Sequence, residues 1–334
     1  PPPPPPPPPP TPPLLFRRQR QMCIRDRFTT ESLELLRSQH GVASKVDLHR
    51  SGLSDRTLRT LIEAGNLIGV VKGVYRIPAV PFDEAARCVA VCAAHPDVAV
   101  SGPTAGRLWG LRRIPRDGRV HVLAPPASHP TIAPWVIPYR TRAFHRHDIV
   151  RRPDGIAVTS RARTALDLAR SVGATDLLSI IEQVMRDGQL ADADLRVVAI
   201  DWMSPQRPWI RRFLELLDGR LRGGPAESHG EVVLGDALAS AGLVGLERQY
   251  RLDLPGYGPA RFDLALPSIR FAIEIDLHPT HAESAGRERD AARDAAAARI
   301  DWRVERVPEA GFGPNLGATT RRLVAMATSL ATDR

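Results

Sequence analysis

Three carboxylates lie in the segment 263–276, where apolar side chains alternate as they do in β-strands. Asp263 belongs to one alternating run, and Glu274 and Asp276 belong to the next. Because successive side chains point to opposite faces of a strand, Glu274 and Asp276 share the face that the apolar residues leave free. Carboxylates on one face repel each other, and a divalent cation between them removes that repulsion. The pattern therefore predicts a Mg²⁺ or Mn²⁺ site for the hydrolysis of phosphodiester bonds.

The turn between the two runs decides whether Asp263 joins the other acids. A two-residue loop at Pro267–Ser268 would place Leu266 opposite Ile269. Asp263 would then share the face of Glu274 and lie diagonal to it, roughly 7–8 Å away. A slip of one residue in the loop would move Asp263 to the other face.

The residues around these acids predict the rest of a domain over 226–334. Its expected element order is α-β-β-β-α-β-α, in a mixed α/β (α+β) fold. Besides the two acidic strands, the expected elements are a helix from Ser228 to Ala241, a strand Glu247–Leu254, a helix Glu283–Arg299, a strand Trp302–Val307 and a helix Leu316–Leu330.

This order and these acids resemble the PD-(D/E)XK, or restriction-endonuclease-like, superfamily of nucleases. They are more similar to the family numbered 559 among domains of unknown function, which is related to very-short-patch repair endonucleases. Asp276 occupies the superfamily's lysine position, and Leu277 replaces a glycine. The motifs that carry the resemblance are Ser228 with Glu231, Arg261 with Asp263, Glu274 with Asp276, His281, Arg289 with Asp290, and Trp302-Arg-Val304.

The expected roles follow from the chemistry of phosphodiester hydrolysis. Asp263 and Glu274 would ligate the metal, and Asp276 would be a further ligand or would orient water. His281 would act as general acid or base near neutral pH. Two further groups complete the candidate site: Glu231 at the helix start, and Arg289 with Arg293, one helical turn apart, as contacts for the phosphate backbone.

Each of these residues also has a structural interpretation. Glu231 forms an ordinary capping box with Ser228, which we favour slightly. Asp263 and Glu274 could instead pair with Arg261 and Arg270 on an exposed sheet face. Similarly, Arg289 and Arg293 could pair with Asp290 and Asp294 on a solvated helix, and His281 could be incidental.

Residues 28–80 predict a winged helix-turn-helix. Ser54 caps the third helix, in which Arg56 and Arg59 point outward, and Lys72 lies near the turn of the following hairpin. In such a module the third helix enters the major groove of DNA and the wing contacts phosphates. The alternative is a tri-helical interaction domain that binds no nucleic acid.

The Gly73-Val-Tyr-Arg76 wing resembles the N-terminal domain of AbiE-type (type IV) antitoxins. That resemblance implies a repressor-like DNA-binding domain and a cognate toxin as a partner. Residues 81–200 resemble the region that follows the winged helix in these antitoxins and are expected to form a mixed α/β domain. Residues 201–225, which are rich in proline and glycine, are expected to form a connector.

We interpret residues 1–27, which open with ten prolines, as an assembly artefact rather than native protein. They hold five Arg and one Asp, so the net charge of +9 falls to +5 without them. The remaining basic excess fits a polyanion such as DNA. Only two cysteines remain and no run is long enough to span a membrane, so a cytoplasmic protein is expected. The sequence does not indicate the oligomeric state.

Two functions from different classes follow. The first is a metal-dependent DNA endonuclease in defence or repair, targeted by its winged helix. The second is an antitoxin-type regulator without enzymatic activity, whose C-terminal domain keeps a nuclease fold for binding only. An RNA-processing nuclease would use the same site chemistry as the first.

Overall fold

The computed structural model describes residues 28–128, 133–142, 144–277 and 284–332. The chain forms two compact units, one from the residues up to Thr104 with Asp117–Thr159, and the other from Ala105–Arg116 with Ser160 onward. The boundary therefore falls inside the expected middle domain 81–200, within α6 (Gly102–Leu108). In the described part of the chain, no helix is long and apolar enough to cross a membrane.

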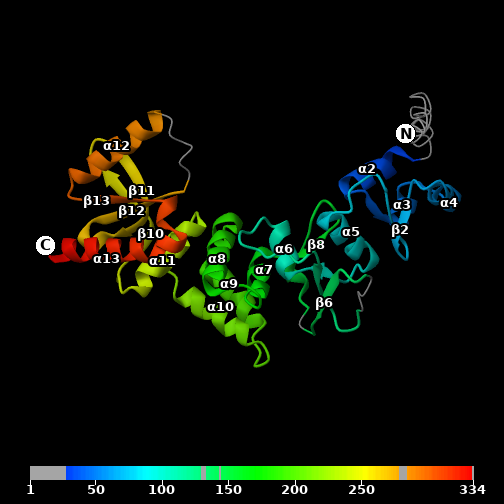
Figure 1. Cartoon of the computed structure of the whole chain (residues 1–334). Coiled ribbons are helices and arrows are strands. Elements are labelled where there is room, and N and C mark those ends of the chain that lie inside the picture. Colours follow the sequence, from blue (N-terminus) through cyan, green and yellow to red (C-terminus); the bar gives the residue numbers. More distant parts are fainter. Residues whose placement is uncertain (1–27, 129–132, 143, 278–283, 333–334) are drawn as a thin grey trace, which may run out of the picture. The chain divides into compact units, whose positions relative to one another are not determined.

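The first unit begins with the expected winged helix (Figure 1). Thr29, Ser44 and Ser54 cap its three helices, each accepting a hydrogen bond from a backbone N–H in the first turn. Three antiparallel strands form the wing in the order β1-β3-β2, of which β1 was not expected. The elements are α2 (Thr30–Ser38), β1 (Val42–Ser44), α3 (Lys45–Arg50), α4 (Asp55–Glu63), β2 (Ile68–Val71) and β3 (Val74–Arg76).

A second sheet completes this unit, with the strand order β6-β5-β4-β8-β7. The unit also has a helix over residues 84–94, and two strands of the sheet have five residues each. Most of the other strands have only two or three residues, too short for an alternating pattern to mark them. The elements are α5 (Glu84–Ala94), β4 (Ala99–Val100), β5 (Val120–Ala124), β6 (Val136–Arg140), β7 (Ile149–Arg151) and β8 (Ala157–Thr159).

The second unit starts with a group of helices that packs against the C-terminal domain. Its helices are α7 (Arg161–Leu168), α8 (Ala174–Gly188), α9 (Asp192–Asp201) and α10 (Pro208–Asp218). The two groups are joined by a buried ion cluster. Glu182 of α8 accepts hydrogen bonds from Arg220, Arg248 and the backbone N–H of Ala226. The segment 201–225 is therefore tied into this unit rather than being a free connector.

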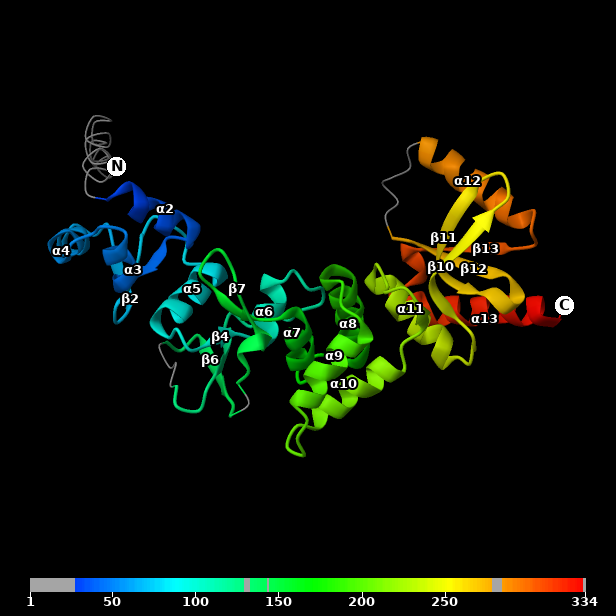
Figure 2. The same cartoon turned by 180° about the vertical axis from the view of Figure 1, so that it is seen from behind.

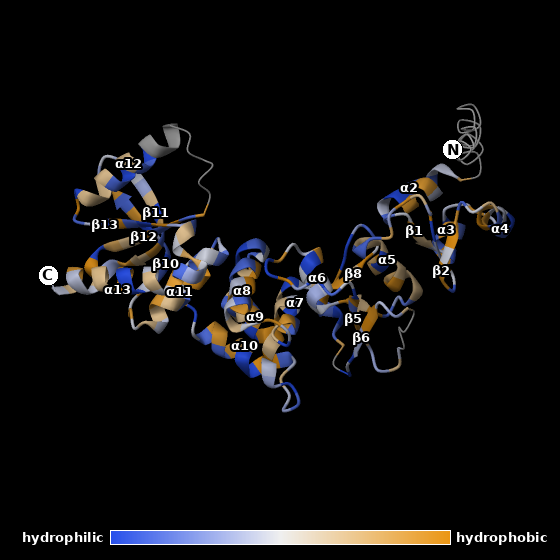
Figure 3. Ribbon diagram, in the orientation of Figure 1, coloured by the Kyte–Doolittle hydropathy of each residue, from blue (hydrophilic) through white to orange (hydrophobic). Residues whose placement is uncertain are grey.

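The C-terminal domain confirms the predicted α-β-β-β-α-β-α order. Its sheet has the strand order β13-β12-β11-β10-β9. The helices that cover the sheet carry both hydrophobic and hydrophilic residues (Figure 3), as the two faces of such a helix require. The elements are β9 (Arg222–Gly223), α11 (His229–Ser240), β10 (Glu247–Leu254), β11 (Gly258–Leu266), β12 (Phe271–Asp276), α12 (Ser284–Ala298), β13 (Arg303–Pro308) and α13 (Leu316–Thr332).

Helices cover both faces of this sheet (Figures 1 and 2). On one face Leu264 and Ile273 pack with Leu234 of α11 and Leu323 of α13. On the other face, apolar strand residues pack with Ala296 and Ala297 of α12 and with Trp302. The sheet is therefore the middle layer of three.

The sheet forks at one end. Strands β11 and β12 pair over only three positions, from Leu264 opposite Ile273 to Leu266 opposite Phe271. Beyond Leu264, β11 continues with β10 as a hairpin, whereas β12 continues with β13 as far as Asp276. At the fork, the backbones of β11 and β12 do not pair, so side chains can enter the space between the two strands.

The loop between β11 and β12 differs from the expected two residues. Leu266 pairs with Phe271, so the loop spans 267–270, with a short 3₁₀ helix at Pro267–Ile269 and Arg270 in the left-handed region at φ 51°. The expected pairing of Leu266 with Ile269 is therefore wrong by two residues. A two-residue shift preserves the faces, and continuing the register by one residue beyond Leu264 and Ile273 places Asp263 level with Glu274 rather than diagonal to it.

Candidate active site

The Asp263 carboxylate lies inside the fork. Its Oδ2 accepts a hydrogen bond of 2.9 Å from the backbone N–H of Ile275, where a ladder bond would otherwise form. Its Oδ1 accepts a weaker one of 3.4 Å from Nε2 of Gln249. Burial raises the pKa of Asp263 to about 6, although both hydrogen bonds favour the charged form. The side chain therefore bridges the two diverging strands.

Glu274 lies beside Asp263 and is largely buried. Burial and then the neighbouring Asp263 carboxylate raise the pKa of Glu274 to about 7. Arg293 of α12 places Nη1 at 3.4 Å from Glu274 Oε1, and each side chain is about 15% exposed. The contact lacks hydrogen-bond geometry, so Oε1 has no hydrogen-bond partner among the described residues. Two largely buried carboxyls thus lie close together, and a charge on Asp263 disfavours a charge on Glu274.

This arrangement fits a divalent cation with a small set of protein ligands. Among the residues that the structure describes, no three His, Cys, Asp or Glu side chains gather as a metal-binding group. Asp276, which is exposed at the end of β12, therefore does not complete a three-carboxylate site with Asp263 and Glu274 here. Mg²⁺, however, is commonly held by one or two carboxylates with water and substrate phosphate. The two buried carboxyls, with an unsatisfied oxygen on Glu274, meet that requirement.

Glu231 confirms the capping interpretation. Ser228 accepts a hydrogen bond from the N–H of Glu231, and Glu231 Oε1 accepts one of 2.7 Å from the N–H of Ser228. Its second oxygen, Oε2, accepts bonds from the N–H of Glu227 and, at 2.6 Å, from Nε2 of Gln249. Both oxygens of Glu231 thus accept hydrogen bonds from the chain, and Glu231 contacts the site through Gln249.

Gln249 is the site residue that the sequence analysis missed. Its carboxamide joins Glu231 on α11 to Asp263 on β11. Its backbone has φ of 50°, a left-handed value that costs a non-glycine residue about 1–3 kcal/mol. Its Oε1 is buried without a hydrogen-bond partner among the described residues. A strained strand residue that contacts two acids is typical of a functional site, but nothing in the sequence around it signals φ above zero.

The strain at Gln249 marks a change of face in the hairpin. Immediately before Gln249, Arg248 is buried against Gly235 of α11. After Gln249, Tyr250 and Leu252 pack in the apolar cluster that contains Ala296 and Ala297 of α12. Gln249 lies at this change of face, and its side chain contacts Glu231 and Asp263.

The surface ion pairs considered for Asp263 and Glu274 do not form. Arg261 pairs with Glu227, with Nη1 at 2.8 Å from Oε1. Arg270 pairs with Asp301 at 3.0 Å. The interpretation of the acids as partners of these two arginines on an exposed face is therefore wrong, because the acids are buried in the fork while the arginines lie outside it.

The two arginines of α12 have different environments. Arg289 is exposed. Arg293 instead points into the site, where it contacts Glu274 and lies over the ring of Phe262 at 5.5 Å. Its longer contacts with Asp290 and Asp294, at 3.6 and 3.8 Å, match the helix-pair interpretation. Arg293 is therefore a counter-charge inside the site. His281 lies outside the described residues.

Leu277 has a packing role that explains its bulk. A Cβ placed on Gly230 of α11 would lie 3.0 Å from the Leu277 side chain and 3.4 Å from Phe312. The first turn of α11 therefore approaches the end of β12 closely, and Leu277 fills the space above Gly230. Leu277 in place of the expected glycine is compatible with the site, because the Leu277 side chain packs toward α11.

The basic residues expected to contact DNA are exposed on the winged helix. Arg56 and Arg59 lie on the outer side of α4, while Leu58 and Leu61 are buried on its inner side. Lys72 is exposed at the turn between β2 and β3, where Gly73 has φ of 78°. Lys45 of α3 forms an ion pair of 2.8 Å with Asp55 at the start of α4.

Comparison with known proteins bears on the N-terminal segment. Residues 31–78 match the family model described as a transcriptional regulator, AbiEi antitoxin. This segment is therefore of the AbiEi antitoxin regulator type, which confirms the resemblance of the winged helix. The resemblance of the C-terminal domain to the family numbered 559 stays a prediction.

No curated protein matches the chain. Among solved structures, the chain is similar to the crystal structure of the RV2827C protein from Mycobacterium tuberculosis, with 21% sequence identity and a TM-score of 0.41. The match covers 66% of this chain and 80% of that chain. This likeness is too slight to carry an argument.

The raised pKa values predict how Glu274→Gln changes stability. A carboxyl whose folded pKa lies above its unfolded value stabilises the protein below the unfolded pKa, and that stability is lost as pH rises through the folded pKa. For Glu274 the window runs from 4.5 to about 7. We expect Glu274→Gln to raise the free energy of unfolding of the metal-free protein by about 2–3 kcal/mol at pH 8 and to leave it nearly unchanged at pH 4.

Urea unfolding with EDTA at both pH values measures this difference. The exposed carboxylate Asp301 provides the control variant Asp301→Asn, which should show no such pH dependence. Equal stability of Glu274→Gln and the unaltered protein at pH 8 would show that Glu274 is not buried as a charge.

Proposed function

We propose that this chain is a DNA-binding protein whose C-terminal domain hydrolyses phosphodiester bonds with Mg²⁺ or Mn²⁺ at Asp263 and Glu274. The observation that carries the proposal is the pair of buried carboxyls in the fork of the sheet. Two carboxyls with raised pKa values destabilise the domain unless a cation or protons neutralise them. Perturbed carboxyls of this kind are typical of functional sites.

We assign each residue of the proposed site a separate role. Asp263 is oriented by the N–H of Ile275 and by Gln249, so its carboxylate is fixed before a cation arrives. Arg293 keeps Glu274 partly neutralised in the meantime. A bound divalent cation polarises a phosphoryl oxygen and lowers the pKa of the attacking water. We propose that Asp276 orients that water, that His281 exchanges protons with the reacting groups, and that Arg289 contacts the phosphate backbone.

The winged helix would bring this domain to DNA. Its AbiEi-type segment is described as a transcriptional regulator, and its exposed cations lie on α4 and at the wing turn. We propose that α4 enters the major groove with Arg56 and Arg59, and that Lys72 contacts a phosphate. A cognate toxin is the protein partner that an antitoxin-type segment suggests.

The cations of α4 and the wing make a specific prediction for DNA binding. Arg56→Ala with Arg59→Ala should weaken duplex binding about 10–100-fold, because each arginine contact with a base or phosphate contributes roughly 1 kcal/mol or more. Gel shifts of the double variant measure this effect. Arg37→Ala with Arg50→Ala is a control of equal charge change on the neighbouring helices. Equal losses of duplex binding in both double variants would indicate that binding depends on net charge alone rather than on this surface.

Cleavage is tested with residues 28–334 and supercoiled plasmid, single-stranded DNA and RNA, each with Mg²⁺, Mn²⁺ or EDTA. Nicking that needs the metal supports the nuclease, and the preferred substrate separates DNA from RNA. A second function is a regulator that binds DNA without cutting it. It is favoured by the AbiEi antitoxin match and by the lack of a three-residue metal group among the described residues. Retained duplex binding with no cleavage of any substrate would select it.

A further inference from the structure

The outer part of the β10–β11 hairpin carries two arginines on one face. Arg251 and Arg261 are directly opposite each other in the antiparallel register. Their neighbours Tyr250, Leu252 and Phe262 pack on the side of α12. Because side chains alternate along a strand, Arg251 and Arg261 face the other way, toward the segment before α11, where Glu227 pairs with Arg261.

Of the two arginines, Arg261 forms an ion pair with a described carboxylate and Arg251 does not. Like charges directly opposite in a sheet repel and destabilise the pairing. Glu227 holds Arg261 with two contacts, of 2.8 Å to Nη1 and 2.9 Å to Nη2. Among the described residues, no carboxylate forms an ion pair with Arg251. Glu227 therefore positions the Arg261 guanidinium, whereas the Arg251 guanidinium is not held by an ion pair within the described part of the chain.

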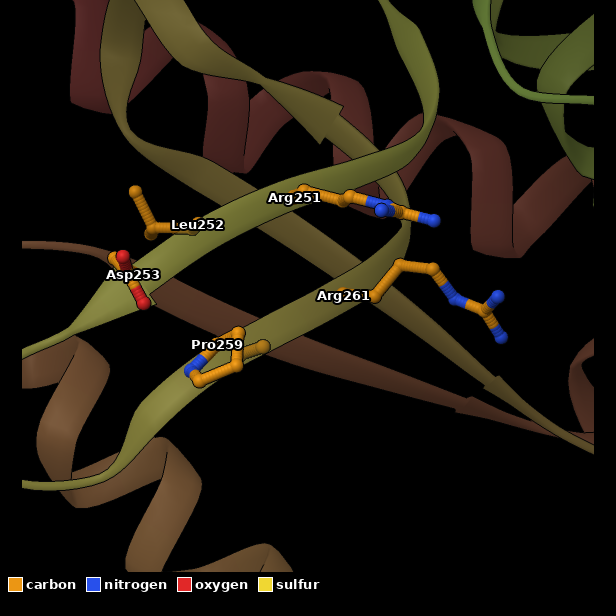
Figure 4. A pocket seen from close by; sticks show the side chains of 6 residues that line it. Arg251, Leu252, Asp253, Pro259 and Arg261 are labelled. Atoms are coloured by element: carbon orange, nitrogen blue, oxygen red, sulfur yellow. The ribbon is translucent and has the colours of Figure 1, made fainter.

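A pocket of about 520 Å³ opens beside the two guanidinium groups. Figure 4 shows the side chains of Arg251 and Arg261 extending in the same direction from neighbouring strands. Asp253 and Pro259, which are opposed two positions further along the hairpin, also line it. The pocket is open to solvent, so an extended chain can cross it.

The position of the pair relative to the fork is fixed by the strand. Arg261 precedes Asp263 by two residues of β11. Two residues of a strand span about 6.6 Å, which is similar to the separation of successive phosphates in a nucleic-acid backbone. The arginine pair and the Asp263 carboxylate therefore belong to neighbouring positions of the same strand.

We propose that Arg251 and Arg261 form a phosphate subsite for a nucleic-acid strand that enters the C-terminal domain. A planar guanidinium binds phosphate oxygens with paired, charge-assisted hydrogen bonds, and the bound phosphate relieves the repulsion between the two guanidinium groups. Glu227 keeps Arg261 extended for this contact. The subsite rests on the proposed function for its neighbour, the scissile phosphate, but its binding does not require cleavage.

The test measures binding of a fluorescent single-stranded DNA 12-mer to the 28–334 protein in EDTA, by anisotropy at several salt concentrations. A single strand avoids major-groove recognition by the winged helix, and EDTA prevents cleavage. Arg251→Ala with Arg261→Ala should raise the Kd at least about 10-fold. It should also reduce the slope of log Kd against log salt by about 1.4, since each phosphate contact on a single strand contributes about 0.7.

Arg303→Ala with Arg321→Ala is the matched control, because both residues are exposed on the same domain and the change in charge is equal. Thermal melting confirms that both double variants fold. Equal losses in the two double variants, or no loss in the hairpin variant, overturn the subsite. Selective loss in the hairpin variant supports it even if the protein never cleaves DNA, which would reject only the nuclease. Cleavage by a hairpin variant that binds like the unaltered protein would reject only the subsite.

Discussion

Asp263→Asn and Glu274→Gln each lower metal-dependent cleavage by at least about 10³-fold. Both substitutions keep the size of the side chain and remove one negative charge from the fork. The loss of one charged ligand removes several kcal/mol of transition-state stabilisation, and each 1.36 kcal/mol is a factor of ten in rate. The measurement is single-turnover nicking of plasmid with Mg²⁺ and with Mn²⁺.

Binding of Mn²⁺ by calorimetry should weaken in parallel, because both carboxyls are proposed to hold the same ion. Asp301→Asn is the control variant, since this exposed carboxylate lies on the same domain and lines neither the fork nor the arginine pocket. Cleavage that survives in both fork variants would place the chemistry elsewhere. Cleavage that is lost while Mn²⁺ binding is kept would assign the two acids to catalysis without metal ligation.

Glu182→Ala lowers the free energy of unfolding by about 3–5 kcal/mol. Glu182 is fully buried, Arg248 is 1% exposed and Arg220 is 12% exposed, so the carboxylate is the counter-charge for two cations inside the protein. Burial also lowers the pKa of Arg248, which shows how costly its charge is without a partner. The N–H of Ala226 loses its acceptor in the same variant.

Urea unfolding at pH 7 measures this loss. Glu215→Ala on α10 is the matched control, because that glutamate is exposed and its removal should change stability by less than about 0.5 kcal/mol. Glu182→Leu combined with Arg248→Met should recover part of the loss, since apolar residues of similar volume often replace a buried ion pair. A loss in Glu182→Ala no larger than in Glu215→Ala would contradict a buried cluster.

Local sequence signals predicted most of the elements. Ser54 and Ser228 each mark a helix start that the structure confirms. The alternation of apolar residues placed β10 at Glu247–Leu254 to the residue. These features depend on side chains a few positions apart, and the sequence displays those directly.

The features that the sequence could not predict depend on distant contacts. Arg248 lies in a charged run, Leu-Glu-Arg-Gln-Tyr, yet it is buried because Glu182, 66 positions away, is its partner. Gln249 in the same run is neutral and carries none of the chemistry by which acids were selected. Its importance comes from the fork, which sets Glu231 and Asp263 on either side of it.

At the loop 267–270, an incorrect prediction of loop length still gave a correct prediction of the side-chain faces. The two-residue expectation was wrong, yet the faces of Asp263 and Glu274 were still predicted, because an error of two residues leaves side-chain parity intact. The positions of Asp276 and Arg293 depended instead on where the fork opens and on how α12 crosses it. Neither of these can be read from a local pattern.

The hydrogen bond from the N–H of Ile275 to the Asp263 carboxylate makes one backbone proton a spectroscopic reporter. An amide that donates to an ionised carboxylate is more strongly polarised than one that donates to a neutral acid. The ¹H and ¹⁵N chemical shifts of Ile275 should therefore follow the ionisation of Asp263 with a midpoint near pH 6. A divalent cation that displaces the carboxyl proton would move that midpoint downward, so a resonance titration reads occupancy of the fork without any substrate.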